Sequence, residues 1–119
     1  MSYPHHDTGK KGEELATHYL QQQGFTILLT NWRYRRYEMD IIAEKSNVLH
    51  FIEVKTRRSS AFGFPEERVN KKKIRTMLMT GAAFQYRNPQ WDQVQYDILS
   101  ITLMKGQPPE FFLIEDVYI

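Results

Sequence analysis

The chain has 119 residues, which suits a single domain over residues 1–119, with residues 1–8 expected to be flexible. It has no cysteine, which excludes disulfide frameworks, iron–sulfur clusters and thiolate zinc sites and favours a reducing, cytoplasmic location. The formal net charge is +2, and no apolar run approaches the roughly 18 residues of a membrane span, so no membrane partner is expected.

The first predicted element is a helix over residues 8–23. Thr8 can cap it, and Gly24 follows where a left-handed C-terminal residue belongs. At about 100° per residue, Glu13 falls beside Leu20 at the border of the apolar face. Glu13 is therefore expected at the rim of the buried side of this helix.

Three strand-like runs follow, and their short connections favour an antiparallel meander. The runs cover residues 25–34, 37–44 and 48–56. The third run is apolar on both faces until its end, as expected of a central strand whose tip emerges into a cleft. At this tip Glu53 and Lys55 share one face, because side chains alternate along a strand.

A second helix is predicted from a cap at Asn70 to about Arg87, followed by strands over residues 94–103 and 110–118. The helix between the third and fourth strands makes a crossover connection, which allows those two strands to be parallel. The predicted fold class is therefore α/β, with the element order αβββαββ and a mixed central sheet flanked by helices.

The turn at residues 45–47 places Asp40 opposite residues near 52, one step from Glu53. Two carboxylates, together with the backbone carbonyl of Val54 and waters, form a hard-oxygen site that suits Mg²⁺ or Mn²⁺. Glu13 would complete this shell or bind a second metal. Such a site predicts phosphodiester hydrolysis, in which Lys55 would hold or activate the attacking water.

Basic residues around this cleft are candidates for nucleic-acid phosphate contacts. They are Arg33, Arg35, Arg57, Arg58, Lys71, Lys72 and Lys73. Residues 1–88 hold 15 Lys and Arg against 9 Asp and Glu, whereas residues 89–119 hold 1 against 5. A basic body with an acidic end is the charge distribution expected of a protein that binds a polyanion.

Each residue alone also fits a structural role. Glu53 and Lys55 could form an ion pair on a wet sheet face, Glu13 could serve the positive end of its helix, and residues 71–73 could be a solvated face. The joint placement of the acidic residues and Lys55 in one predicted cleft favours the catalytic interpretation. His18 and His50 are isolated in the sequence, so no histidine metal site is expected.

Together these residues resemble the YraN-like family of uncharacterised bacterial proteins. The resemblance rests on four motifs: Gly12-Glu13 with Ala16 and Tyr19, Asn31-Trp32-Arg33, residues 38–43, and residues 51–57. It extends over nearly the whole chain and includes Phe62-Gly63 and Lys73. That family is similar to archaeal Holliday junction resolvases and belongs with the PD-(D/E)XK nucleases, which have a restriction-endonuclease-like fold.

The resemblance implies a Mg²⁺-dependent DNA endonuclease. In it, Asp40 and Glu53 would be metal ligands, Lys55 the catalytic lysine and Glu13 the acid carried by the first helix. The leading hypothesis is therefore a nuclease that acts on DNA, including branched or junction DNA, for which a homodimer would fit cleavage of both strands. A non-catalytic nucleic-acid-binding module on the same fold is the alternative, and a protein-interaction adaptor recognised through its acidic end is a third.

Overall fold

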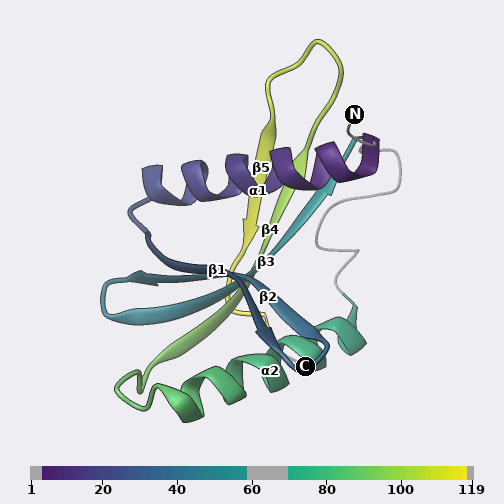
Figure 1. Cartoon of the computed structure of the whole chain (residues 1–119). Helices are drawn as coiled ribbons and strands as arrows, with labels where there is room; N and C mark the ends of the chain where they lie inside the picture. Colours follow the sequence, from purple (N-terminus) through teal and green to yellow (C-terminus); the bar gives the residue numbers. More distant parts are fainter. Residues whose placement is uncertain (1–3, 59–69, 118–119) are drawn as a thin grey trace.

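The computed structural model describes residues 4–58 and 70–117, with side chains described from residue 11. In these ranges the helices and strands follow one another in the predicted order αβββαββ (Figure 1). They are α1 (Pro4–Gln22), β1 (Thr26–Tyr34), β2 (Tyr37–Lys45), β3 (Val48–Arg57), α2 (Lys71–Arg87), β4 (Val94–Thr102) and β5 (Glu110–Ile114).

The five strands form one mixed sheet in the order β1-β2-β3-β4-β5. β3 and β4 are parallel, and the other neighbouring pairs are antiparallel. The parallel pair is connected through α2, as a crossover connection requires. This sheet confirms the predicted fold class and is compatible with a restriction-endonuclease-like arrangement.

The two helices cover opposite faces of the sheet (Figure 1). On one face α1 buries Ala16 and Leu20 in a cluster that includes Ile41 and Ile52. On the other face α2 packs against residues such as Phe51. Each helix thus has one apolar face that packs against the sheet. Among the described residues no helix is long and apolar enough to cross a membrane.

Two element boundaries differ from the sequence prediction by more than one residue. α1 begins at Pro4 rather than at Thr8, because proline is well tolerated at the first position of a helix. The last strand ends at Ile114 because Asp116 adopts a φ of 56° and its N–H donates to Asp97 Oδ1 at 2.9 Å. The chain thereby leaves the β4–β5 ladder after Ile114. Residue 118, the predicted end of this strand, lies outside the described residues, as do residues 1–3 and 119.

His50 forms a buried polar pair with Asp97 on the neighbouring strand. Its Nδ1 lies 2.6 Å from Asp97 Oδ2, and its ring packs edge-on against Phe25. Asp97 also accepts a hydrogen bond from Gln95 Nε2 at 2.9 Å. A buried carboxylate and imidazole need such partners, so the structure accounts for His50 as an internal hydrogen-bonding residue.

Candidate active site

The β2–β3 ladder ends where the two predicted carboxylates meet. Its last pair is Ile41 with Ile52, and one further step would place Asp40 opposite Glu53. Instead, Asp40 Oδ2 accepts a hydrogen bond from the backbone N–H of Val54 at 2.8 Å. The carboxylate therefore takes the place of a β2 carbonyl, and the predicted proximity of Asp40 to Glu53 is found.

Glu53 is buried, and its two carboxylate oxygens have different surroundings. Oε1 lies 3.0 Å from Lys73 Nζ, an ion pair that connects β3 to the first turn of α2. Oε2 is buried and has no hydrogen-bond partner within the part of the chain that the structure describes. A buried carboxylate oxygen without a partner is costly, so this atom marks a place that an additional cation would stabilise.

The pKa of Asp40 is raised from 3.8 to about 6. Burial is the main cause because it disfavours the charged form, and the negative charges of Glu53 and Glu38 act in the same direction. The Val54 hydrogen bond and the Lys73 charge oppose this shift. Above pH 6 Asp40 is therefore ionised, close to the carboxylate of Glu53 and to the partly exposed Lys73.

This pair of side chains fits a divalent cation. Both supply hard carboxylate oxygens, and the free Oε2 of Glu53 has no other partner among the described residues. The C=O of Val54 points to the same side of β3 as its N–H, which faces Asp40, because the two groups of one strand residue point the same way. In the described ranges no three or more His, Asp or Glu side chains are placed to hold a metal ion together. Two carboxylates are compatible with Mg²⁺, which usually keeps several waters beside one or two carboxylates.

Glu13 is half-buried on α1 and lies next to β1 instead of joining this pair. Its Oε1 accepts a hydrogen bond from Asn31 Nδ2. Asn31 stands between the pairs that Thr30 and Trp32 form with β2, so it lies across from Asp40. Glu13 is therefore one residue removed from the carboxylate pair, and its role as a metal ligand stays a prediction.

Asn31 is a residue near the site that was not predicted from the sequence as a site residue. It has a φ of 54°, a left-handed conformation that asparagine tolerates better than most residues. Asparagine is also depleted in strands. An asparagine in the middle of a predicted strand was therefore a usable signal, although its partner Glu13 could not be predicted from it.

Lys55 and Arg57 follow Glu53 along the same face of β3. Both are half-buried, and Arg57 Nε is buried without a hydrogen-bond partner among the described residues. Arg58 lies exposed in the bend after the strand. Lys55 therefore lies about 6 to 7 Å along the backbone from Glu53, as strand geometry requires.

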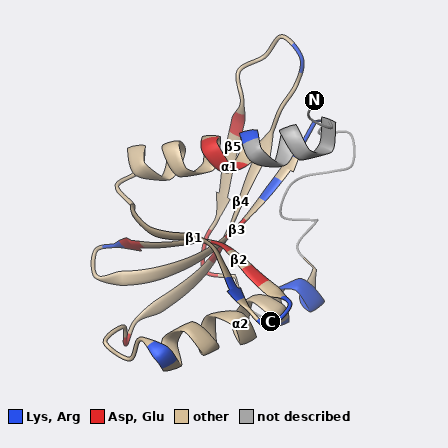
Figure 2. Ribbon diagram, viewed as in Figure 1, with Lys and Arg blue, Asp and Glu red and all other residues tan. Residues whose placement is uncertain are grey.

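The start of α2 brings a second basic group to the site. The side chain of Asn70 caps the helix by accepting from the N–H groups of Lys72 and Lys73, which confirms the predicted cap. Lys71 and Lys72 are exposed, whereas Lys73 contacts Glu53. Figure 2 shows a basic segment of β1 and the basic first turn of α2 to either side of an acidic segment of β2.

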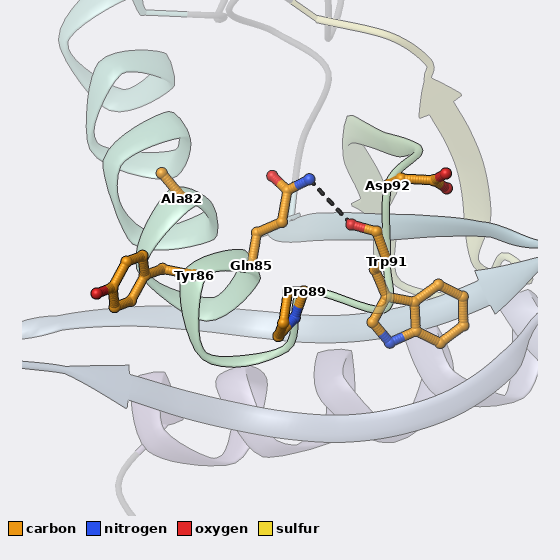
Figure 3. Close-up of a pocket in the computed structure, with 6 residues that line it drawn as sticks. All are labelled: Ala82, Gln85, Tyr86, Pro89, Trp91 and Asp92. Carbon is orange, nitrogen blue, oxygen red and sulfur yellow. Dashed lines mark hydrogen bonds between the residues drawn. The ribbon is translucent and has the colours of Figure 1, made fainter.

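A separate pocket lies at the other end of α2 and does not include any predicted site residue. It is lined by Ala82, Gln85, Tyr86, Pro89, Trp91 and Asp92 (Figure 3). Gln85 Nε2 donates to the carbonyl of Trp91 at 3.0 Å, which holds the connection to β4 in place. Asp92 is the only charged residue of this lining, so the pocket lacks the paired carboxylates found at the β2–β3 site.

Comparison with known proteins assigns the chain to a sequence family. The family model described as "Uncharacterised protein family UPF0102" matches residues 12–101, three quarters of the chain. The chain belongs to this family. The match contains Glu13, Asp40, Glu53 and Lys55, and it confirms the family resemblance predicted from the sequence, since UPF0102 is the YraN family.

Individual UPF0102 proteins match over most of their length. One from Phocaeicola vulgatus is 41% identical over 113 residues, covering 95% of this chain and 90% of the relative. One from Flavobacterium psychrophilum is 39% identical and covers 82% of each chain. One from Rhodococcus opacus is 35% identical, covering 92% of this chain and 94% of the relative.

Proposed function

We propose that this UPF0102 protein is a metal-dependent endonuclease that hydrolyses DNA phosphodiester bonds, with Mg²⁺ or Mn²⁺ held by Asp40 and Glu53. The observation that carries the proposal is the buried Glu53 Oε2, which has no partner among the described residues and lies beside an Asp40 whose pKa is raised to about 6. A divalent cation would relieve both the unpaired oxygen and the repulsion between the carboxylates.

The residues of the site would have different roles in hydrolysis. When bound, a divalent cation polarises the phosphate and lowers the pKa of the attacking water. Lys55 lies on the same face of β3 as Glu53. It would orient that water and stabilise the charge that develops on the phosphate. Lys71 and Lys72, exposed at the start of α2, would hold neighbouring phosphates.

DNA, including branched or junction DNA, is the substrate class that we propose. Arg33 on β1 and Lys71 and Lys72 at the start of α2 are exposed, and these two segments lie to either side of an acidic segment of β2 (Figure 2). A nucleic-acid backbone could therefore span the site. A homodimer would bring two such sites to the two strands of a junction. We also propose a cytoplasmic location, in keeping with a chain that has no cysteine.

One contact favours the alternative of a nucleic-acid-binding module without turnover. The Lys73–Glu53 ion pair at 3.0 Å already neutralises one carboxylate oxygen, as a purely structural ion pair would do. In that case the protein would bind nucleic acid with a strong dependence on salt, and Glu53→Gln would leave this binding unchanged.

Cleavage assays with purified protein test the proposal. Labelled linear, flapped and four-way DNA is incubated with Mg²⁺, with Mn²⁺ or with EDTA, using the wild type, Glu53→Gln and the matched control Glu115→Gln. Glu115 is exposed beyond the end of β5. We expect cation-dependent cleavage of at least one DNA by the wild type and by Glu115→Gln, and none by Glu53→Gln. Equal behaviour of the wild type and Glu53→Gln on every DNA would contradict the proposal.

A further inference from the structure

The tip of the β1–β2 hairpin has an unusual sequence for a tight turn. Tyr34 pairs with Tyr37 across the two strands, so Arg35 and Arg36 alone form the turn. Arg35 has a φ of 58°, a left-handed conformation that two-residue hairpin turns normally assign to glycine or asparagine. Backbone strain of this kind clusters at functional positions, so the turn is a candidate for binding.

Each arginine of the turn lies over an aromatic ring. The Cζ atom of Arg35 is 5.3 Å from the centroid of the Tyr34 ring, and that of Arg36 is 5.2 Å from the centroid of the Tyr37 ring. Arg36 Nη2 also donates to the Tyr37 hydroxyl at 3.1 Å. Both arginines remain exposed while the rings are half-buried, so each ring has a guanidinium group within cation–π distance at the surface.

A second set of contacts extends this surface to α2. Trp32 and Tyr34 lie on one face of β1, and their ring planes differ by 4° with centroids 6.5 Å apart. Arg87, exposed in the last turn of α2, lies 6.0 Å from the Trp32 centroid and 5.8 Å from that of Tyr34. We name residues 32–37 together with Arg87 the arginine–tyrosine hairpin.

The arginine–tyrosine hairpin is basic and close to the carboxylate pair. Residues 32–37 contain three arginines and no acidic residue, and Glu38, the next residue, is paired with Arg33 at 3.1 Å. Tyr37 precedes Asp40 by three residues in β2, which corresponds to about 10 Å along a strand. A strand of nucleic acid bound at the hairpin would therefore reach Asp40 within a few nucleotides.

We propose that the arginine–tyrosine hairpin binds single-stranded nucleic acid and presents unpaired nucleotides to the Asp40–Glu53 pair. Unpaired bases stack on aromatic rings and on guanidinium planes, and both are present here. A duplex hides the faces of its bases, so it would use only the phosphate contacts of the arginines. Delivery to the carboxylates rests on the function proposed above, whereas binding by the hairpin does not.

Fluorescence anisotropy in EDTA tests the proposal without any cleavage. The probes are labelled oligo(dT), a DNA duplex of the same length and a labelled polyglutamate peptide. The proteins are the wild type, the double variant Tyr34→Leu/Tyr37→Leu and the control Tyr86→Leu, which changes a tyrosine that is 88% exposed on α2. Leucine keeps apolar bulk at the half-buried positions, and thermal melting followed by circular dichroism checks the fold.

We expect the wild type and Tyr86→Leu to bind oligo(dT) at least about tenfold more tightly than duplex. The double tyrosine variant should lose about tenfold or more for oligo(dT) and less than about twofold for duplex. A second variant, Arg35→Gln/Arg36→Gln, changes only exposed side chains. It should lower the slope of log affinity against log salt by about 1.4 for the single strand, which corresponds to two phosphate contacts.

Three results would overturn the proposal: equal affinity for single strand and duplex, unchanged oligo(dT) binding by the double tyrosine variant, or polyglutamate binding as tight as that of oligo(dT). The last result would indicate an acidic protein partner. Because the assay excludes divalent cations, failure of the nuclease proposal leaves its outcome unaffected. Conversely, normal cleavage together with unchanged oligo(dT) binding by the tyrosine variant would reject the role of the hairpin and leave the nuclease proposal standing.

Discussion

Replacing Lys55 by alanine is expected to lower the rate of DNA cleavage by about 10²- to 10³-fold, which is the usual effect of removing one group that stabilises transition-state charge. Lys55 lies on the same face of β3 as Glu53 but has no place in the proposed metal shell. The variant should therefore bind Mn²⁺ as the wild type does. Single-turnover cleavage with saturating Mn²⁺ measures the rate, and calorimetry measures the metal affinity.

The matched control for this variant is Lys105→Ala, which removes an exposed lysine from the connection between β4 and β5. Its cleavage rate should equal that of the wild type. A Lys55→Ala rate within about threefold of the wild type would contradict the role assigned to this lysine, because a catalytic contact contributes far more than that.

Replacing Asp40 by asparagine is expected to stabilise the fold at alkaline pH. The folded protein protonates Asp40 near pH 6, whereas the ordinary pKa of aspartate is 3.8. The folded state therefore binds more protons than the unfolded state between these values, and wild-type stability increases as the pH falls through this window. Above pH 6 the ionised carboxylate lowers the free energy of unfolding by about 2–3 kcal/mol, since each pKa unit corresponds to about 1.4 kcal/mol.

Asparagine keeps an acceptor for the Val54 N–H and carries no charge. Asp40→Asn should therefore exceed the wild type by about 2–3 kcal/mol at pH 8, and the difference should vanish near pH 4. Urea unfolding in EDTA at both pH values measures it, with Asp92→Asn as an exposed control. Asp40→Asn that is no more stable than the wild type at pH 8 would show that the site does not hold a destabilising charge.

The meeting of Asp40 and Glu53 could be predicted because it depends on local rules. A short turn fixes which residues of two antiparallel strands face each other, and strand alternation fixes the shared face of Glu53 and Lys55. The cap at Asn70 was equally local, since its side chain binds N–H groups two and three residues away. The family resemblance then connected these separate motifs to one fold.

Contacts between distant segments could not be predicted by such local rules. Lys73 was predicted to bind phosphate, yet the packing of α2 brings it to Glu53. Glu13 was predicted near the metal, yet the position of α1 places it on Asn31. The pairing of His50 with Asp97 requires the parallel β3–β4 pair. Each of these contacts is set by how a helix or strand docks on the sheet, which the spacing of residues in the sequence does not determine.

The central claim is that Asp40 and Glu53 together hold a divalent cation, and calorimetric titration with Mn²⁺ tests it most directly. At pH 7.5 the wild type and Asp92→Asn should bind the metal, while Asp40→Asn and Glu53→Gln should bind it at least about tenfold more weakly, since loss of even an outer-shell contact has effects of this size. Wild-type binding should also weaken below pH 6, where protons compete for Asp40. Mn²⁺ binding of equal strength in all four proteins would contradict the claim.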